Sequence, residues 1–442
     1  METPNLKGIL KELNGLATPL MFNLVFGLIV SFINRAMIGR LSIDAIGIVG
    51  AVDSLLFTIA GIVGVVAITF NVYGSRALGK KNEKQFELYF SSAIMLNIFL
   101  GVLIAIVIFV FQRLFLSTVF GFEGINLENS IMYLSIMSVY PLFQIILFSF
   151  STFFKIKQAT KYIFICSTIS TILNLFLNYL LIFGNFGFPQ LEIIGVAIAT
   201  LISLSANVLL CALIIKGKVN FIYDIKKLYK HIVLFIKESR FLALQEVLEG
   251  SVFFVGINAF LSHMGLLEAY VQIMLIISIA FATMHIYATA TLVIIGRNVN
   301  SKKIYLLKIP KIAVIVSSFT SLILGILFFA FRFEVIYFLS PNAEFAHLTA
   351  GLLKVTIVAN MLSPAYIIYK ASLQALKQSE YVLYGTFLIN AITFILIGIL
   401  VLYLELGYMG VVVGIFLNYL ILAILFYLKY TRSISLSEIV KN

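Results

Sequence analysis

The sequence has no tryptophan, two cysteines, seven prolines and only 11% charged residues among its 442. Soluble domains carry about 25% charged and about 45–50% apolar residues, so a chain that is 62% hydrophobic is not an ordinary globular protein. The scarcity of proline and the lack of low-complexity tracts exclude collagen-like and disordered chains. Two thiols, Cys166 and Cys211, are too few for a disulfide scaffold or a cysteine-rich metal site.

Repeated apolar runs of about 20 residues or more are present instead, each long enough to cross a bilayer as a helix. They predict an all-α polytopic membrane protein with twelve transmembrane helices in two pseudo-symmetric six-helix bundles. The predicted spans are 15–38, 43–78, 84–112, 127–154, 160–184, 191–216, 239–264, 266–297, 303–331, 344–376, 380–403 and 407–430.

Positive charge gathers on one side of this topology. The loops on that side carry 25 of the 31 basic residues, and the opposite loops carry three, namely Arg40, Arg113 and Arg332. The positive-inside rule therefore places both termini in the cytoplasm and the chain in the cell membrane. Because the net charge of +12 follows the loops, it does not indicate a nucleic-acid partner.

A basic amphipathic stretch, KGKVNFIYDIKKLYKHIVLFIKESR, interrupts the apolar rhythm from Lys216 to Arg240. It predicts a helix on the cytoplasmic membrane surface, with a calmodulin-like target as the alternative. We expect an N-terminal six-helix lobe over 1–217, a linker over 218–238 and a C-terminal lobe over 239–442. Six spans on either side of a cytoplasmic linker keep one orientation, which is typical of parallel repeats.

Several blocks resemble the multidrug and toxic compound extrusion (MATE) family, within the wider multidrug/oligosaccharidyl-lipid/polysaccharide flippase superfamily. The strongest is ATPLMFNLVFGLIVSFINRAMIGRLSIDAIGIVG (17–50), which is similar to the family's first helix and turn, with an early proline, Pro19. NLFLNYLLIFGNFGFPQLEIIGVAIAT (174–200) resembles the connection between its fifth and sixth helices. Looser matches are YGSRALGKKN, IIGRNVNSKK and SPAYIIYKASLQALKQS, so the resemblance covers nearly the whole chain.

The resemblance implies two lobes around a central cavity and a secondary active exporter of organic, often cationic, compounds. Such a protein alternates access between the lobes and exchanges its substrate for Na⁺ or H⁺. It is expected to need no cofactor. We expect a monomer whose partners are membrane lipids and a small organic substrate. The alternative is a flippase for a lipid-linked oligosaccharide or polysaccharide precursor. An enzyme is not expected, because the four histidines form no HxxxD or HExxH motif and GxSxG is absent.

The first lobe departs from the family pattern by losing its acids. The frequent first-helix Asp falls on Asn34, and a fifth-helix Asn and Asp pair falls on Asn174 and Asn178. We expect these residues, with Thr200, to form a polar uncharged chamber that binds Na⁺ through neutral oxygens. Asparagine takes up no proton near neutral pH, so a proton relay there is not supported. The alternative is that these residues only join helices by hydrogen bonds.

Ionisable residues inside spans are costly and are therefore functional candidates. Arg35 and Lys354 lie near outer ends, where snorkelling accounts for them, and Asp53 could pair with Arg35. Four candidates fall in the second lobe at overlapping depths and are predicted to couple transport to the cation, with Glu249 as the principal carboxylate: Glu249, Glu246, His285 and Lys370. The alternative is a buried Glu–Lys pair that only joins helices.

Prolines occupy matching places in the two halves. Pro141 and Pro364 fall in the fourth and tenth spans, and Pro19 falls in the first. A proline within a span frees a carbonyl and bends the helix, so these three predict kinks that serve gating; ordinary kinks are the alternative.

Overall fold

The computed structural model describes residues 6–39, 41, 43–118, 120–248, 253–339 and 343–439. These residues are almost entirely helical, and each of the twelve predicted spans contains helix. Nine described helices are long and apolar enough to cross a membrane, and the bent pair Ala269–Ala280 and Ala282–Arg297 would be a tenth. The prediction of an all-α polytopic membrane protein is confirmed.

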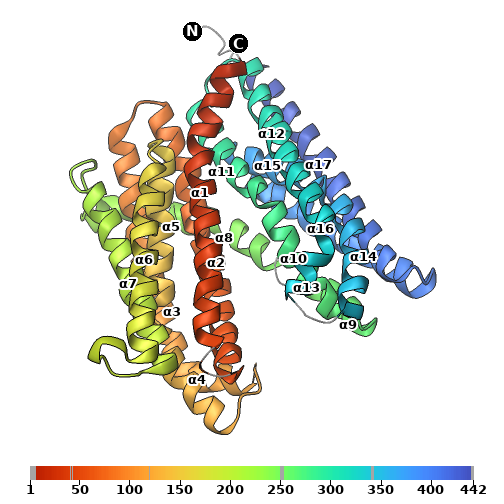
Figure 1. The fold of residues 1–442 in the computed structure, drawn as a ribbon. Coiled ribbons are helices and arrows are strands. Elements are labelled where there is room, and N and C mark those ends of the chain that lie inside the picture. Colours follow the sequence, from red (N-terminus) through yellow and green to blue (C-terminus); the bar gives the residue numbers. More distant parts are fainter. Residues whose placement is uncertain are drawn as a thin grey trace. The chain divides into compact units, whose positions relative to one another are not determined.

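The helices form two compact units (Figure 1). The first unit is Thr18–Ser239, and the second contains the residues up to Ala17 and those from Arg240 onward. The first unit holds most of α1 (Leu6–Gly39) and of α8 (Ile225–Glu246). Between them lie α2 (Ile43–Gly79), α3 (Glu83–Thr118), α4 (Gly124–Met137), α5 (Tyr140–Ile156), α6 (Lys161–Phe183), the short 3₁₀ turn Asn185–Gly187 and α7 (Glu192–Ile215).

The second unit continues from the end of α8, and its helices carry the greens and blues of Figure 1. They are α9 (Phe254–His263), α10 (Leu267–Ala280), α11 (Ala282–Arg297), α12 (Lys303–Ala330), α13 (Arg332–Leu339), α14 (Ala343–Asn360), α15 (Ser363–Ala375), α16 (Ser379–Gly398), the π-helical turn Ile399–Tyr403 and α17 (Gly407–Ile439).

Two of the prolines stand where predicted spans divide. Pro141 and Pro364 lie in the first turns of α5 and α15, just after α4 and α14 end. Proline is tolerated in a first helical turn because its missing N–H would have no partner there. Pro19 lies within α1. A further break at Phe281 bends α10 against α11 by 45° without any proline.

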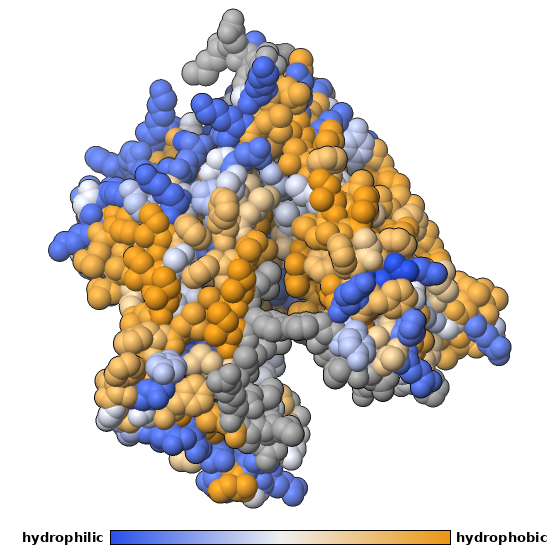
Figure 2. Space-filling model, viewed as in Figure 1, coloured by the Kyte–Doolittle hydropathy of each residue, from blue (hydrophilic) through white to orange (hydrophobic). Residues whose placement is uncertain are grey.

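On the face shown in Figure 2, apolar side chains cover much of the surface, while hydrophilic ones gather toward helix ends. On α3, for example, Phe99 and Val110 are 65% and 63% exposed. Soluble monomers rarely expose contiguous apolar surface of this kind, whereas lipid-facing helices require it. Each unit also has an apolar core, built around Leu56 and Tyr133 in the first and Ile273 and Leu353 in the second.

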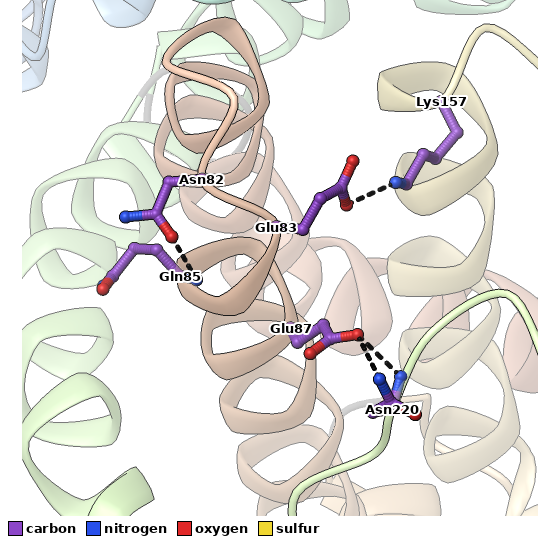
Figure 3. Close-up of polar contacts among 6 residues, drawn as sticks. All are labelled: Asn82, Glu83, Gln85, Glu87, Lys157 and Asn220. Atoms are coloured by element: carbon purple, nitrogen blue, oxygen red, sulfur yellow. Dashed lines mark hydrogen bonds and ion pairs between the residues drawn. The ribbon is translucent and has the colours of Figure 1, made fainter.

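The segment between α7 and α8 is fastened to α3 (Figure 3). The carboxylate of Glu87 accepts hydrogen bonds from the backbone N–H and the side-chain Nδ2 of Asn220, at 2.9 and 3.1 Å. Nearby, Lys157 Nζ donates to Glu83 Oε2 at 2.8 Å. Asn82 Oδ1 accepts from the backbone N–H of Gln85 and so caps the start of α3. The two bonds between Asn220 and Glu87 hold the segment against α3.

Candidate functional site

A cavity of about 760 Å³ lies within the first unit. Its wall is contributed by α1, α2, α4, α5, α6 and α7. Cavities of about 300–1,000 Å³ are typical of small-molecule sites. The wall is largely apolar, with Val30, Phe57 and Leu204 among its residues. The polar groups in it therefore decide what it can bind.

Three asparagines form a hydrogen-bonded cluster, and two of them, Asn34 and Asn174, line the cavity. Asn34 Nδ2 donates to Asn174 Oδ1 at 2.9 Å, and Asn178 Nδ2 is within bonding distance of both Asn34 Oδ1 (3.0 Å) and Asn174 Oδ1 (3.2 Å). Asn174 and Asn178 stand one turn apart on α6, so they share the face that meets α1. The structure brings the three predicted residues together, and Thr200 of α7 lines the same cavity as Asn34 and Asn174.

One oxygen of this cluster lacks a donor. Asn178 is 1% exposed, and its Oδ1 is buried with no hydrogen-bond partner. A buried acceptor left unpaired costs about 1–3 kcal/mol, so such an atom calls for an explanation. A cation or a water molecule at this position would satisfy the carbonyl oxygen.

Asp53 is a cavity residue that the sequence analysis did not place in a site. It is the only carboxylate among the described residues of the cavity wall. Its Oδ1 accepts a hydrogen bond from the phenol of Tyr133 at 3.0 Å, and Tyr133 is fully buried. The side chain of Arg35, the partner expected for Asp53, lies outside the described residues. The sequence feature that points to Asp53 as a site residue is its position deep within an apolar span, where a carboxylate is costly.

The charged candidates of the second unit are only partly described. Glu249 lies outside the described residues. Glu246 ends α8 and is exposed, and His285 of α11 is exposed as well. Lys370 of α15 is half-buried, with its Nζ 3.4 Å from the Tyr366 hydroxyl and 5.6 Å from the centre of that ring. Within the described part of the chain, no group of three or more His, Cys, Asp or Glu residues could hold a metal ion.

The second unit contains its own asparagine cluster. Asn418 Nδ2 of α17 is 2.9 Å from Asn390 Oδ1 and 3.0 Å from Thr393 Oγ1, both on α16. All three side chains are buried. This cluster joins two helices inside the unit, whereas Asn34 and Asn174 face a cavity.

Comparisons with known proteins agree with this architecture. Residues 19–180, which include the three asparagines of the first unit, match the MatE family model. Probable multidrug resistance proteins of two bacteria are similar to parts of the chain. YoeA of Bacillus subtilis is 28% identical over 192 residues, or 43% of this chain and 41% of that protein. NorM of Thermotoga maritima is 26% identical over 209 residues, which are 46% of this chain and 43% of that protein. The chain thus matches less than half the length of either relative.

Solved structures extend the likeness to the whole chain. An outward-facing multidrug resistance MATE family transporter superposes with a TM-score of 0.86 at 18% identity, covering 98% of this chain and 99% of that one. The chain therefore has the fold of MATE transporters, and its residues 19–180 match the MatE family model. A second MATE-like fold, a MOP superfamily transporter from Pyrococcus furiosus, gives a TM-score of 0.85 at 19% identity, with 98% and 99% coverage. The relatives are described as probable multidrug resistance proteins, and both solved structures are described as transporters.

Proposed function

We propose that this chain is a MATE-type secondary active exporter of organic cations, driven by inward movement of Na⁺ or H⁺. The observation that carries the proposal is the cavity of the first unit, which combines an apolar wall, neutral amide oxygens and one carboxylate. In this proposal the chain acts as a monomer in the cell membrane, with both termini in the cytoplasm, and alternates access between its two lobes.

The cavity suits an organic cation. Phe57, Val30 and Leu204 offer apolar contact to a hydrophobic body, and Asp53 supplies negative charge on the same wall. A cationic substrate is attracted to a carboxylate more strongly in a site with low-dielectric walls than in water. Specificity for charge then comes from Asp53, while the apolar wall tolerates different shapes.

Na⁺ is the coupling ion that the three asparagines favour. Hard cations prefer oxygen ligands, and the buried Asn178 Oδ1 has no donor competing for it. Asn34 is hydrogen-bonded to both Asn174 and Asn178, so Asn34 and Asn174 each add a carboxamide oxygen to the same cluster. Since none of the three side chains titrates near neutral pH, they would bind Na⁺ without exchanging a proton.

Part of the coupling is proposed for the second lobe. Glu249 is the principal carboxylate in this proposal, with Glu246, His285 and Lys370 as its neighbours. Sequence spacing supports it, because Glu246 and Glu249 stand three residues apart. A cationic substrate and the coupling ion would compete there for one negative charge. Pro19, Pro141 and Pro364 are proposed as the places where helices bend between access states.

Efflux of a fluorescent organic cation from energised vesicles, under a Na⁺ gradient or a pH gradient, tests the function. We expect Asn178→Leu to weaken the Na⁺-driven component, because it removes the unpaired oxygen. The matched control is Asn390→Leu, which disrupts a buried helix-joining bond in the second unit and should lower stability while leaving the ion dependence unchanged. Each such bond is worth about 0.6 kcal/mol in membranes.

Two results would contradict the proposal. If neither gradient drives efflux of any organic cation, the chain is not an exporter of this class. The second is that Asn178→Leu behaves like Asn390→Leu, with the same change in stability and an unchanged ion dependence of efflux. The asparagines of the first unit would then only join helices.

A further inference from the structure

The exposed face of α8 carries a regular mixture of basic and large apolar side chains, which we name the α8 stripe. Its members are Lys226, Tyr229, Lys230, Val233, Ile236 and Lys237, all of them exposed. At about 100° per residue they fall within a sector of about 120°. Tyr229, Val233 and Ile236 are 67%, 45% and 53% exposed.

The opposite face of α8 is fixed to the first unit. Leu228 and Phe235 are fully buried, and the Phe235 ring stacks on Tyr89 of α3 with 5.9 Å between centroids. His231 is hydrogen-bonded to Gln85 at 3.0 Å, and Ser239 to Thr69 at 2.8 Å. The stripe therefore has a set orientation and cannot turn its apolar side chains inward.

These contacts also set the depth of the stripe. Gln85 lies at the start of α3, whereas Thr69 lies ten residues before the end of α2. From His231 to Ser239, α8 therefore runs from the α2–α3 turn into the bundle. Lys226 and Lys230 lie near the turn, and Val233 and Ile236 lie about 5 and 9 Å deeper than Lys230 at 1.5 Å per residue.

The charges of the stripe have one sign. Lys226, Lys230 and Lys237 share it with no acidic residue, and Lys227, at its edge, is offset by Asp224 at 3.4 Å. Lys237 lies deeper, but its long side chain can carry the amine about one turn toward the α2–α3 end.

We propose that the α8 stripe is a binding site for an anionic phospholipid of the leaflet at the α2–α3 end. Its lysines meet the headgroup phosphate, Tyr229 lies at the interface, and Val233 and Ile236 contact the acyl chains. Lys226 and Lys230 precede Val233 and Ile236 with depth, which is the order of headgroup and acyl chains in a phospholipid; Lys237 lies beyond them and reaches back along α8 toward the headgroup level. Clustered lysines on an amphipathic helix attract anionic lipids by complementary charge.

The absence of tryptophan makes a direct test simple. Tyr229→Trp gives a protein with a single tryptophan, which brominated lipids quench on contact. The variant is placed in nanodiscs in which either phosphatidylglycerol or phosphatidylcholine, at the same mole fraction, carries the bromine. We expect brominated phosphatidylglycerol to quench about twofold more than brominated phosphatidylcholine, with the difference lost at high salt.

Charge-removal variants identify the source of the preference. We expect the ratio of quenching by brominated phosphatidylglycerol to quenching by brominated phosphatidylcholine to fall close to one when three lysines are neutralised in the Tyr229→Trp protein. The substitutions are Lys226→Gln, Lys230→Gln and Lys237→Gln. The matched control removes three exposed lysines of α12 and its approach, Lys302, Lys308 and Lys311, and should keep the ratio of the parent. Val233→Trp, one turn deeper, serves as a second reporter if Tyr229→Trp does not fold.

Two outcomes overturn the inference. Equal quenching by both brominated lipids in the parent means that the stripe touches lipid without selecting the headgroup. No quenching by either lipid, at Tyr229→Trp and at Val233→Trp, means that the stripe faces water or protein and that its lysines serve another purpose.

Discussion

Asparagine serves two different purposes in this molecule. In the first unit, Asn34, Asn174 and Asn178 form a cluster that borders a cavity and leaves one buried oxygen unpaired. In the second, Asn390 and Asn418 are buried and bond directly between α16 and α17. Both clusters are built from asparagine, but only the first borders a cavity. That access makes the first a candidate ion site, whereas the second only holds two helices together.

The second-lobe coupling proposal leads to a prediction for Glu249. Glu249→Gln keeps the size of the side chain and removes its charge, so ion-driven efflux should be abolished while the protein remains inserted and folded. Transport under a Na⁺ gradient and under a pH gradient, with membrane yield as the folding measure, checks this. Glu405→Gln, an exposed residue between the π-helical turn and α17, is the control and should transport normally.

Normal transport by Glu249→Gln under both gradients would show that coupling does not depend on this carboxylate. The asparagine cluster of the first unit would then be the remaining candidate for ion binding.

At the scale of the helices, α6 and α7 approach each other closely at Gly195. A Cβ at Gly195 would lie 2.7 Å from the Leu181 carbonyl oxygen and 2.8 Å from its carbon. These are backbone atoms, which cannot swing aside. The same two helices carry Asn174 and Thr200, so their spacing fixes how these side chains meet the cavity.

We therefore expect Gly195→Ala to lower the thermal unfolding temperature in detergent. Overpacking costs about 1–3 kcal/mol, which exceeds the ~1 kcal/mol that alanine gains over glycine within a helix. Gly61→Ala is the matched control, because a Cβ there meets nothing within 4 Å and should leave stability unchanged or raised. An unfolding temperature for Gly195→Ala equal to that of Gly61→Ala would show that α6 and α7 separate freely.

Helix positions could be predicted from the sequence because apolar length and proline are local signals. The breaks before α5 and α15 each lie directly before a proline, Pro141 or Pro364, which is visible in the sequence. The 45° bend at Phe281 has no proline beside it, so neither local signal predicted it, and 266–297 was expected as one span. The asparagine cluster was predictable only through family resemblance. The role of Asp53 was not, because its contact with Tyr133 joins residues 80 positions apart.

At the scale of the whole molecule, the charge distribution predicts a definite topology. Single cysteines at Lys81, Lys157 and Lys303 should label from the cytoplasm with a membrane-impermeant maleimide, and one at Glu405 should label from outside. The native Cys166 and Cys211 are buried, so they give little background. Labelling of the Lys157 and Glu405 positions from the same side would overturn the topology, with unmodified protein as the reference for background.

The passage of α1 from one unit to the other at Ala17–Thr18 bears on how such a chain could arise. If the two halves descend from a tandem duplication, the ancestral copies would have met near the α7–α8 segment. Cutting there yields neither unit intact, because the first fragment keeps residues 6–17, whose contacts belong to the second unit. On that history the halves have exchanged their leading segments, since most of α8 correspondingly lies in the first unit, as swapped subunits of a dimer do.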